Sequence, residues 1–329
     1  MQRTFNTNKT LWVGIAFSFA FVVLIKVAGD LWLPPRDFAA DNPDVMMWYL
    51  WQLREPSFWS RFTAWGFYAV HQLSIWYLIW RAQTGKLKYT NALHWENVAA
   101  LAVNAFFICV HLLQSLVWYD GLAQDVPEWT SQASVALMLF VILMIENSRR
   151  GLVFGYKAPL GEDVTRMVRK YHGYYFSWAI LYTFWYHPME TTLGHLAGFL
   201  YMFLLMLQGS LFFTRAHVNP RWTIWAEISV VGHAVMVAYV AGHMGWAMFL
   251  AGFTGVFLIT QMHGLGFSRA TRWVIGIACI AALAGLFAYI GDISLMQRIP
   301  LIPFIQYLGV LVIGLVLWLM LQLARLISK

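Results

Sequence analysis

The chain has 329 residues, of which 60% are hydrophobic and only 11% are charged. A soluble domain carries roughly 25% charged residues, so this composition excludes an ordinary soluble fold and predicts an all-α, polytopic integral membrane protein. The net charge of +7 does not indicate a nucleic-acid partner, because the basic residues stand in short loops between apolar runs, where membrane proteins place them.

About ten apolar runs follow one another along the chain, each long enough to cross a bilayer. Backbone groups inside lipid must find hydrogen-bond partners within their own segment, so we expect each run to be a transmembrane helix of a single domain over residues 1–329. The runs cover approximately residues 11–33, 60–81, 96–119, 131–149, 171–187, 192–214, 222–241, 243–262, 272–290 and 302–324.

The loops between the runs alternate in charge. Lys and Arg are concentrated in one set of loops, and most Asp and Glu lie in the other. Because basic residues stay on the cytoplasmic side, we expect both termini to be cytoplasmic, and we expect the bacterial inner (plasma) membrane as the location. Lys86, Lys157 and Lys329 are predicted to face the cytoplasm, and Asp41, Asp125 and Asp292 are predicted to face outside.

Two loops are more than connectors. The outer loop, residues 34–59, contains Asn42 and Pro43, which suit the start of a helix, and then the aromatic segment 45–53. This segment is either a short helix on the outer interface or an irregular aromatic loop. The inner loop, residues 149–170, ends in a basic segment, 166–170, for which we expect contact with anionic lipid headgroups.

Ionisable side chains inside a membrane mark a functional site by default. Depth counted along each helix places six His and one Glu between the bilayer centre and the outer face. We expect them around one outward-opening cavity, with His71 and His233 at its floor. The candidate catalytic residues are His111, His187, Glu190, His195 and His243, whereas His94, His172, His217 and His263 lie at inner positions and are expected to be ordinary.

The third apolar run carries a polar stripe. Asn97, Asn104 and His111 recur every seven residues, so they share nearly one face of a helix, which Gln114 and Ser115 extend outward. Such a face must meet protein or water and not lipid. For the Asn residues we favour hydrogen bonding between helices, while for His111 this role and a functional role are both open.

Other charged residues in or near the runs have simpler interpretations. Lys26 and Asp30 stand four residues apart on the first run and can pair in its outer part, or reach the surface separately. Glu146 and Glu227 lie near the inner face and predict interfacial ion pairs with neighbouring Arg. The ninth and tenth runs have Gln306 as their main polar side chain, so we expect a scaffold or a protein-partner surface there and place any site in the first eight.

The favoured function is a membrane-embedded enzyme whose His/Glu site acts on an amphiphilic substrate, such as a lipid or a lipid-linked acyl or glycosyl group. His serves as a general base, and a carboxylate orients it. The spacing His187-x2-Glu190-x4-His195, joined by His71 or His233, could also hold a divalent metal, although it matches no standard zinc spacing. Ten helices with both ends inside are also the layout of some bacterial acyltransferases, an analogy of topology alone.

Two alternatives remain open. A proton-coupled transporter would use the intramembrane His, but Pro is nearly absent from the runs, and the broken helices typical of transporters are not evident. A haem-binding electron carrier would use His71 with His111 or His233 as axial ligands. Nucleotide use is not expected, because the sequence contains no Gly-rich phosphate loop.

Overall fold

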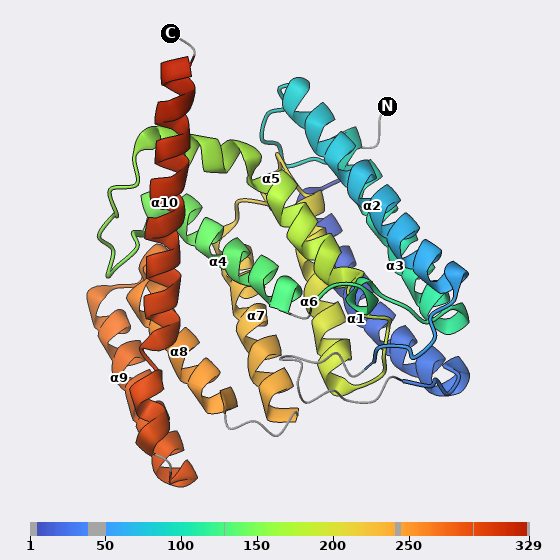
Figure 1. Cartoon of the computed structure of the whole chain (residues 1–329). Helices are drawn as coiled ribbons and strands as arrows, with labels where there is room; N and C mark the ends of the chain where they lie inside the picture. Colours follow the sequence, from blue (N-terminus) through green and yellow to red (C-terminus); the bar gives the residue numbers. More distant parts are fainter. Residues whose placement is uncertain (1–4, 39–50, 128, 241–244, 292, 328–329) are drawn as a thin grey trace. The chain divides into compact units, whose positions relative to one another are not determined.

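The computed structural model of the chain describes residues 5–38, 51–127, 129–240, 245–291 and 293–327. The structure is all-helical, with 78% helix and no strand among the described residues (Figure 1). Its α-helices are α1 (Thr7–Trp32), α2 (Phe58–Thr84), α3 (Trp95–Val117), α4 (Trp129–Arg150), α5 (Glu162–Phe184), α6 (Leu193–Ser210), α7 (Pro220–Val240), α8 (Gly245–Ile259), α9 (Arg269–Ile290) and α10 (Leu301–Ile327). Short 3-10 helices are η1 (Leu122–Gln124), η2 (Gln261–Gly264) and η3 (Ile293–Arg298).

Each of the ten predicted apolar runs coincides with one of these helices. Within the described residues, eight helices are long and apolar enough to cross a membrane, which supports a polytopic membrane protein. The other two, α2 and α5, have sufficient length but a more polar composition. The number of helices that cross and the side on which each terminus lies therefore stay predictions.

Local sequence signals explain several helix ends. Asn6 caps α1 by accepting hydrogen bonds from the amides of Asn8 and Lys9, as short polar side chains do at an N-terminus. Ser57 caps α2 in the same way. At its C-terminus α9 ends on Gly291, whose φ of 75° is the left-handed conformation that glycine adopts without steric cost.

The chain divides into two compact units, and the single transmembrane domain over residues 1–329 stays a prediction. The first unit comprises Met1–Val135 and Gly173–Ala226. Within it, α3 packs against α1, α2 and α6, and α1 also packs against α6 (Figure 1). Because α3 has neighbours on three sides, a polar face on this helix can be buried in protein.

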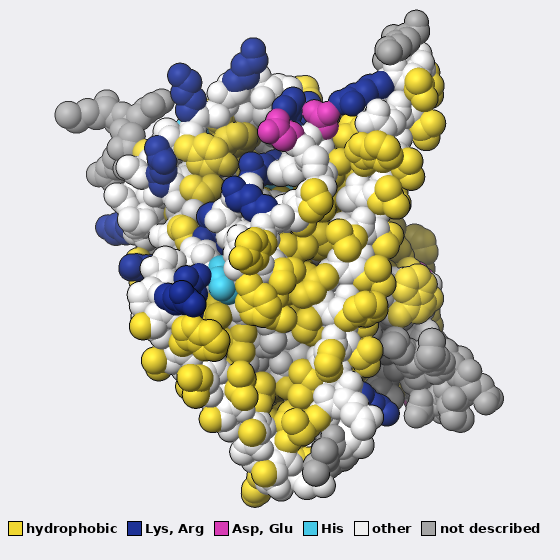
Figure 2. Space-filling view, turned by 90° about the vertical axis from the view of Figure 1, so that its left-hand side faces the viewer, with side chains coloured by type: hydrophobic (Ala, Val, Ile, Leu, Met, Phe, Trp, Pro, Cys, Tyr) yellow, Lys and Arg dark blue, Asp and Glu magenta, His cyan; other side chains and the backbone are white. Residues whose placement is uncertain are grey.

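The second unit comprises Ala136–His172 and Glu227–Lys329. Within it, α8 packs against α9 and α10. An apolar cluster joins α4, the start of α5 and α10 through Leu143, Met144, Val164 and Val310. Figure 2 shows a face on which hydrophobic side chains form a broad surface and most Lys and Arg side chains gather toward the upper end.

Two expectations about loops have different outcomes. The inner loop predicted over residues 149–170 is shorter, because α5 already begins at Glu162. Two acidic residues, Glu162 and Asp163, stand in its first turn, where they interact favourably with the helix dipole. The basic segment 166–170 is therefore helical. Most of the aromatic segment predicted over residues 45–53 lies outside the described residues.

Candidate functional site

The polar stripe of α3 faces protein along its length, as predicted. Near the N-terminus of α3, the Asn97 amide donates to the carbonyls of Ser210 and Phe212, at 2.8 and 2.9 Å. These bonds satisfy backbone groups where α6 ends and explain why α6 stops before residue 214. The other stripe residues are also buried: Asn104, His111, Gln114 and Ser115.

Two stripe residues hold the turn that connects α5 to α6. His111 Nε2–H donates to the carbonyl of His187 at 2.8 Å. One helical turn further along, the Ser115 hydroxyl accepts from the amide of Met189 at 2.7 Å. Because residues four apart lie on the same helix face, this edge of α3 fixes the backbone of the turn at two successive points.

Tyr119, just beyond α3, supplies a third point. Its hydroxyl donates to a carboxylate oxygen of Glu190, and both side chains are buried. Tyr119 has a φ of 50°, a left-handed conformation that is uncommon outside glycine and persists where the surroundings hold it. The backbone contributes too, because the amide of Leu122 donates to the carbonyl of Trp185 at 3.0 Å. We call His111, Ser115 and Tyr119 the α3 clamp.

His71 belongs to a directional hydrogen-bond chain. The indole of Trp185 can only donate, and it donates to His71 Nδ1 at 3.2 Å. His71 Nε2 must therefore carry the proton and donate to the Asn104 side-chain oxygen at 2.8 Å. The Asn104 amide donates to the Ser210 hydroxyl, which donates to the carbonyl of Met206. Both ring nitrogens of this fully buried His are thus used within the protein.

His187 and His195 are placed differently from His71 and His111. Each residue as a whole is partly buried, although His187 Nδ1 and His195 Nε2 are buried atoms. The ring centroids lie 5.0 Å apart in an edge-to-face arrangement. The ring of Trp51 lies 4.4 Å from that of His195. Thr192, which caps α6, has its hydroxyl 2.7 Å from His195 Nδ1 and orients this imidazole.

Charged side chains surround the loop that follows α3. Arg61 pairs with Asp120 at 2.7 Å and also with Asp125, and it donates to the carbonyl of Gly121 at 3.0 Å. Asp120 is only 3% exposed. Burial raises the pKa of the Asp120 carboxyl above its usual value, and the neighbouring Arg61 opposes that rise.

The predicted Lys26–Asp30 pair is present on α1, with both side chains about half exposed. Next to Asp30, Gly29 packs against the methyl group of Thr191. The C-terminal part of α1 therefore lies beside the segment that leads from Glu190 into α6. The pair belongs to the same region as the predicted site.

The structure brings most of the predicted site residues together in the first unit. His71 and His111 both contact Trp185, His111 bonds to the backbone of His187, and His187 lies against His195. His233 belongs to the second unit, and His243 lies outside the described residues. No three His, Cys, Asp or Glu residues are placed to hold a metal within the described part, so the metal hypothesis gains no support.

The second unit contains an ion pair that the sequence placed at an interface. Arg150 holds Glu227 through three hydrogen bonds of 3.0–3.1 Å, and the two side chains are 0% and 6% exposed. The amide of Gln261 donates to the same carboxylate at 2.7 Å. The predicted pairing of Glu227 with an Arg is present, and neighbouring helices bury both groups. Their position at the membrane interface stays a prediction. Glu146 pairs with Arg149, which lies three residues later on α4, as predicted.

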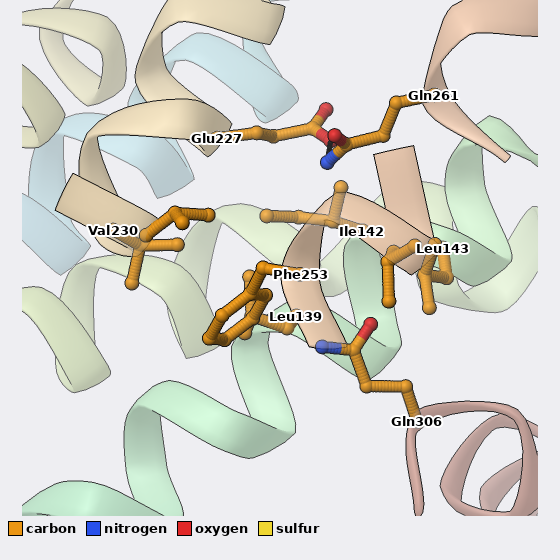
Figure 3. A pocket seen from close by; sticks show the side chains of 10 residues that line it. Leu139, Ile142, Leu143, Glu227, Val230, Phe253, Gln261 and Gln306 are labelled. Atoms are coloured by element: carbon orange, nitrogen blue, oxygen red, sulfur yellow. Dashed lines mark hydrogen bonds between the residues drawn. The ribbon is translucent and has the colours of Figure 1, made fainter. Parts of the chain in front are cut away.

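A small cavity adjoins this ion pair (Figure 3). Glu227 and Gln261 lie at one end, and Gln306 of α10 points in from the other side. The sequence led us to expect no site in α10, although Gln306 was noted as the main polar side chain of the last two runs. The apolar walls are Leu139, Ile142, Leu143, Val230, Val231, Phe253 and Val256.

No family model, curated protein or solved structure matches this chain. We therefore infer the function from the chain's own residues.

Proposed function

We propose that the chain is a membrane-embedded enzyme in which His187 and His195 form an acid–base pair at the outer face, acting on an amphiphilic substrate. The observation that supports this proposal is that the rings of His187 and His195 lie edge to face with their centroids 5.0 Å apart. His71 and His111 are fully buried and donate within the protein, whereas His187 and His195 are partly exposed as residues, with His187 Nδ1 and His195 Nε2 facing inward.

The other predicted catalytic residues become positioning residues in this proposal. His111 donates to the carbonyl of His187 and so fixes the backbone that carries this imidazole. Glu190 is tied to Tyr119, which fixes the turn that leads into α6 and His195. Productive acid–base geometry needs side chains held by such supporting contacts.

The chemistry is a proton transfer coupled to group transfer. One imidazole removes the proton of an acceptor hydroxyl, and the resulting oxygen attacks an acyl or glycosyl donor. The second imidazole, in its protonated form, gives a proton to the leaving oxygen. Imidazole suits both roles, because its ordinary pKa lies near neutral pH. A site bordered by apolar helices favours a lipid or lipid-linked substrate.

A proton-coupled transporter is the second candidate, because the buried Arg150–Glu227 pair lies in helices with the composition of membrane spans. Intramembrane ion pairs are typical of transport pathways. A haem carrier has less support, since both ring nitrogens of His71 are already hydrogen bonded. Membrane lipid around the helices and a protein partner at α9 and α10 stay predictions.

Complementation of a strain lacking the gene tests the proposal. We expect His187→Ala and His195→Ala to insert and fold normally but to abolish complementation. His111→Gln should complement better than His111→Ala, because the Gln amide can still donate to the carbonyl of His187. His94→Ala and His217→Ala are the controls and should complement.

The same assay separates the candidate functions. Full complementation by both His187→Ala and His195→Ala would overturn the enzyme proposal. Loss of complementation by Glu227→Gln alone, with both His variants active, would favour the transporter.

A further inference from the structure

The polar groups around the cavity of the second unit are only partly satisfied. Glu227 Oε2 accepts three hydrogen bonds, from Arg150 twice and from Gln261, whereas Oε1 accepts one. A carboxylate oxygen accepts about two hydrogen bonds, so Oε1 can take another donor. Gln306 is 6% exposed, and it lines the cavity opposite Glu227 (Figure 3).

The cavity is large enough for water. The centre of a water molecule can occupy about 20 Å³ of it, and roughly 10–15 Å³ of occupied volume is enough for one molecule. Cavities of this size with two to four polar partners hold water, whereas purely apolar ones stay dry.

We propose that Glu227, Gln261 and Gln306 form a binding site for internal water within the second unit. The water donates to Glu227 Oε1 at one end of the cavity, exchanges hydrogen bonds with the Gln306 carboxamide at the other (Figure 3), and so bridges the two groups. The Arg150–Glu227 pair is then in contact with internal water. Such hydrated carboxylates in spanning helices have the composition of proton-relay sites, so this is a second place, independent of His187 and His195, where the chain can exchange protons.

The sign of a stability change tests this site. If the water bridges Glu227 and Gln306, Gln306→Leu leaves it without a partner, and the Tm in detergent should fall by about 2–4 °C. If Gln306 has no partner, the same change removes an unsatisfied amide, and the Tm should rise. Gln72→Leu is the matched control: Gln72 is 4% exposed, its amide is unpaired, and it lines no cavity described for the chain. Its Tm should hold or rise.

A second measurement does not depend on a folded variant. X-ray radiolysis of internal water produces hydroxyl radicals that oxidise adjacent side chains, which mass spectrometry detects. In the unmodified protein, Leu143, which is 3% exposed and lines the cavity, should be oxidised, whereas the fully buried Leu122 should not. A Tm that rises for Gln306→Leu as it does for Gln72→Leu, or equal protection of Leu143 and Leu122, would overturn the proposal.

Discussion

At the scale of single residues, burial and hydrogen-bond direction separate the histidines that sequence depth alone had grouped. His71 receives a hydrogen bond from Trp185 and gives one to Asn104, so its neutral form is built into the packing. His195 has one ring nitrogen oriented by Thr192, and the residue as a whole is partly exposed. The same kind of side chain is therefore part of the packing in one place and is proposed to act as an acid or base in another.

Arg61 offers a residue-scale prediction. Replacing Arg61 with Met leaves the buried Asp120 carboxylate without its cation, and we expect a loss of about 3–5 kcal/mol in the free energy of unfolding near neutral pH. Burial already raises the pKa of Asp120, and the rise becomes larger without Arg61. A raised folded-state pKa contributes stability below the unfolded value and loses it as pH increases through the folded value. The variant should therefore be more stable at about pH 5 than at about pH 8.

Thermal unfolding in detergent across this range measures the effect. The double variant Arg61→Met/Asp120→Asn is the control, since it removes the charge that is left unpaired. It should recover part of the lost stability and lose most of the pH dependence. A single variant whose stability increases with pH would show that Asp120 does not carry the effect.

The sequence grouped His111, His187, Glu190 and His195 by their expected depth, and the structure places them near one another in the first unit. Their role as a site stays a prediction. Trp185 and Tyr119 were missed, because aromatic residues near helix ends are usually interface anchors. The burial of Arg150 and Glu227 was also missed, because position along a helix does not show whether neighbouring helices exclude water.

At the scale of secondary-structure elements, α3 organises the first unit through the α3 clamp. Ser115→Ala removes the acceptor of the Met189 amide, and we expect a loss of about 1–3 kcal/mol, the cost of a buried unsatisfied group. Hydrogen exchange of residues 185–191 should become faster. Ser74→Ala is the matched control, because the Ser74 hydroxyl bonds only to its own helix at Val70. Equal exchange of residues 185–191 in both variants would contradict the clamp.

Contact between α4 and α10 in the second unit gives another prediction. A Cβ added at Gly309 would lie 2.6 Å from the Phe140 ring, so Gly309→Ala should cost about 1–3 kcal/mol by overpacking. At Gly276 of α9 an added Cβ meets nothing within 4 Å. Gly276→Ala should therefore be neutral or gain up to about 1 kcal/mol from helix propensity. Thermal unfolding compares the two, and equal Tm values would contradict this packing.

The helices themselves were predictable, because lipid requires long apolar segments with internal hydrogen bonds. Their ends were less so. The start of α5 was missed by nine residues, since its first turns are charged and an apolar run does not include them. α6 ended earlier than predicted, at Ser210. The Asn97 amide of α3 binds the carbonyls of Ser210 and Phe212, so these groups have partners without a further turn of α6.

At the scale of the whole molecule, the two units carry different chemistry. The first holds the partly exposed imidazoles, and the second holds the buried ion pair. The boundaries between them fall inside α4, α5 and α7. Sequence reasoning could not find this division, because hydropathy along the chain carries no information on which helices touch.

The claim that the His187–His195 site opens to the outer side of the membrane can be tested by cysteine labelling in intact cells. Cys109 and Cys279 are first replaced by Ala, and then Glu55→Cys or Lys157→Cys is introduced, since both positions are exposed. Glu55 is close in sequence to Trp51, which contacts His195, so it reports on the side of the site. An impermeant maleimide should label Cys at position 55 directly and Cys at position 157 only after the membrane is permeabilised. Labelling of position 157 from outside, with position 55 protected, would contradict the account.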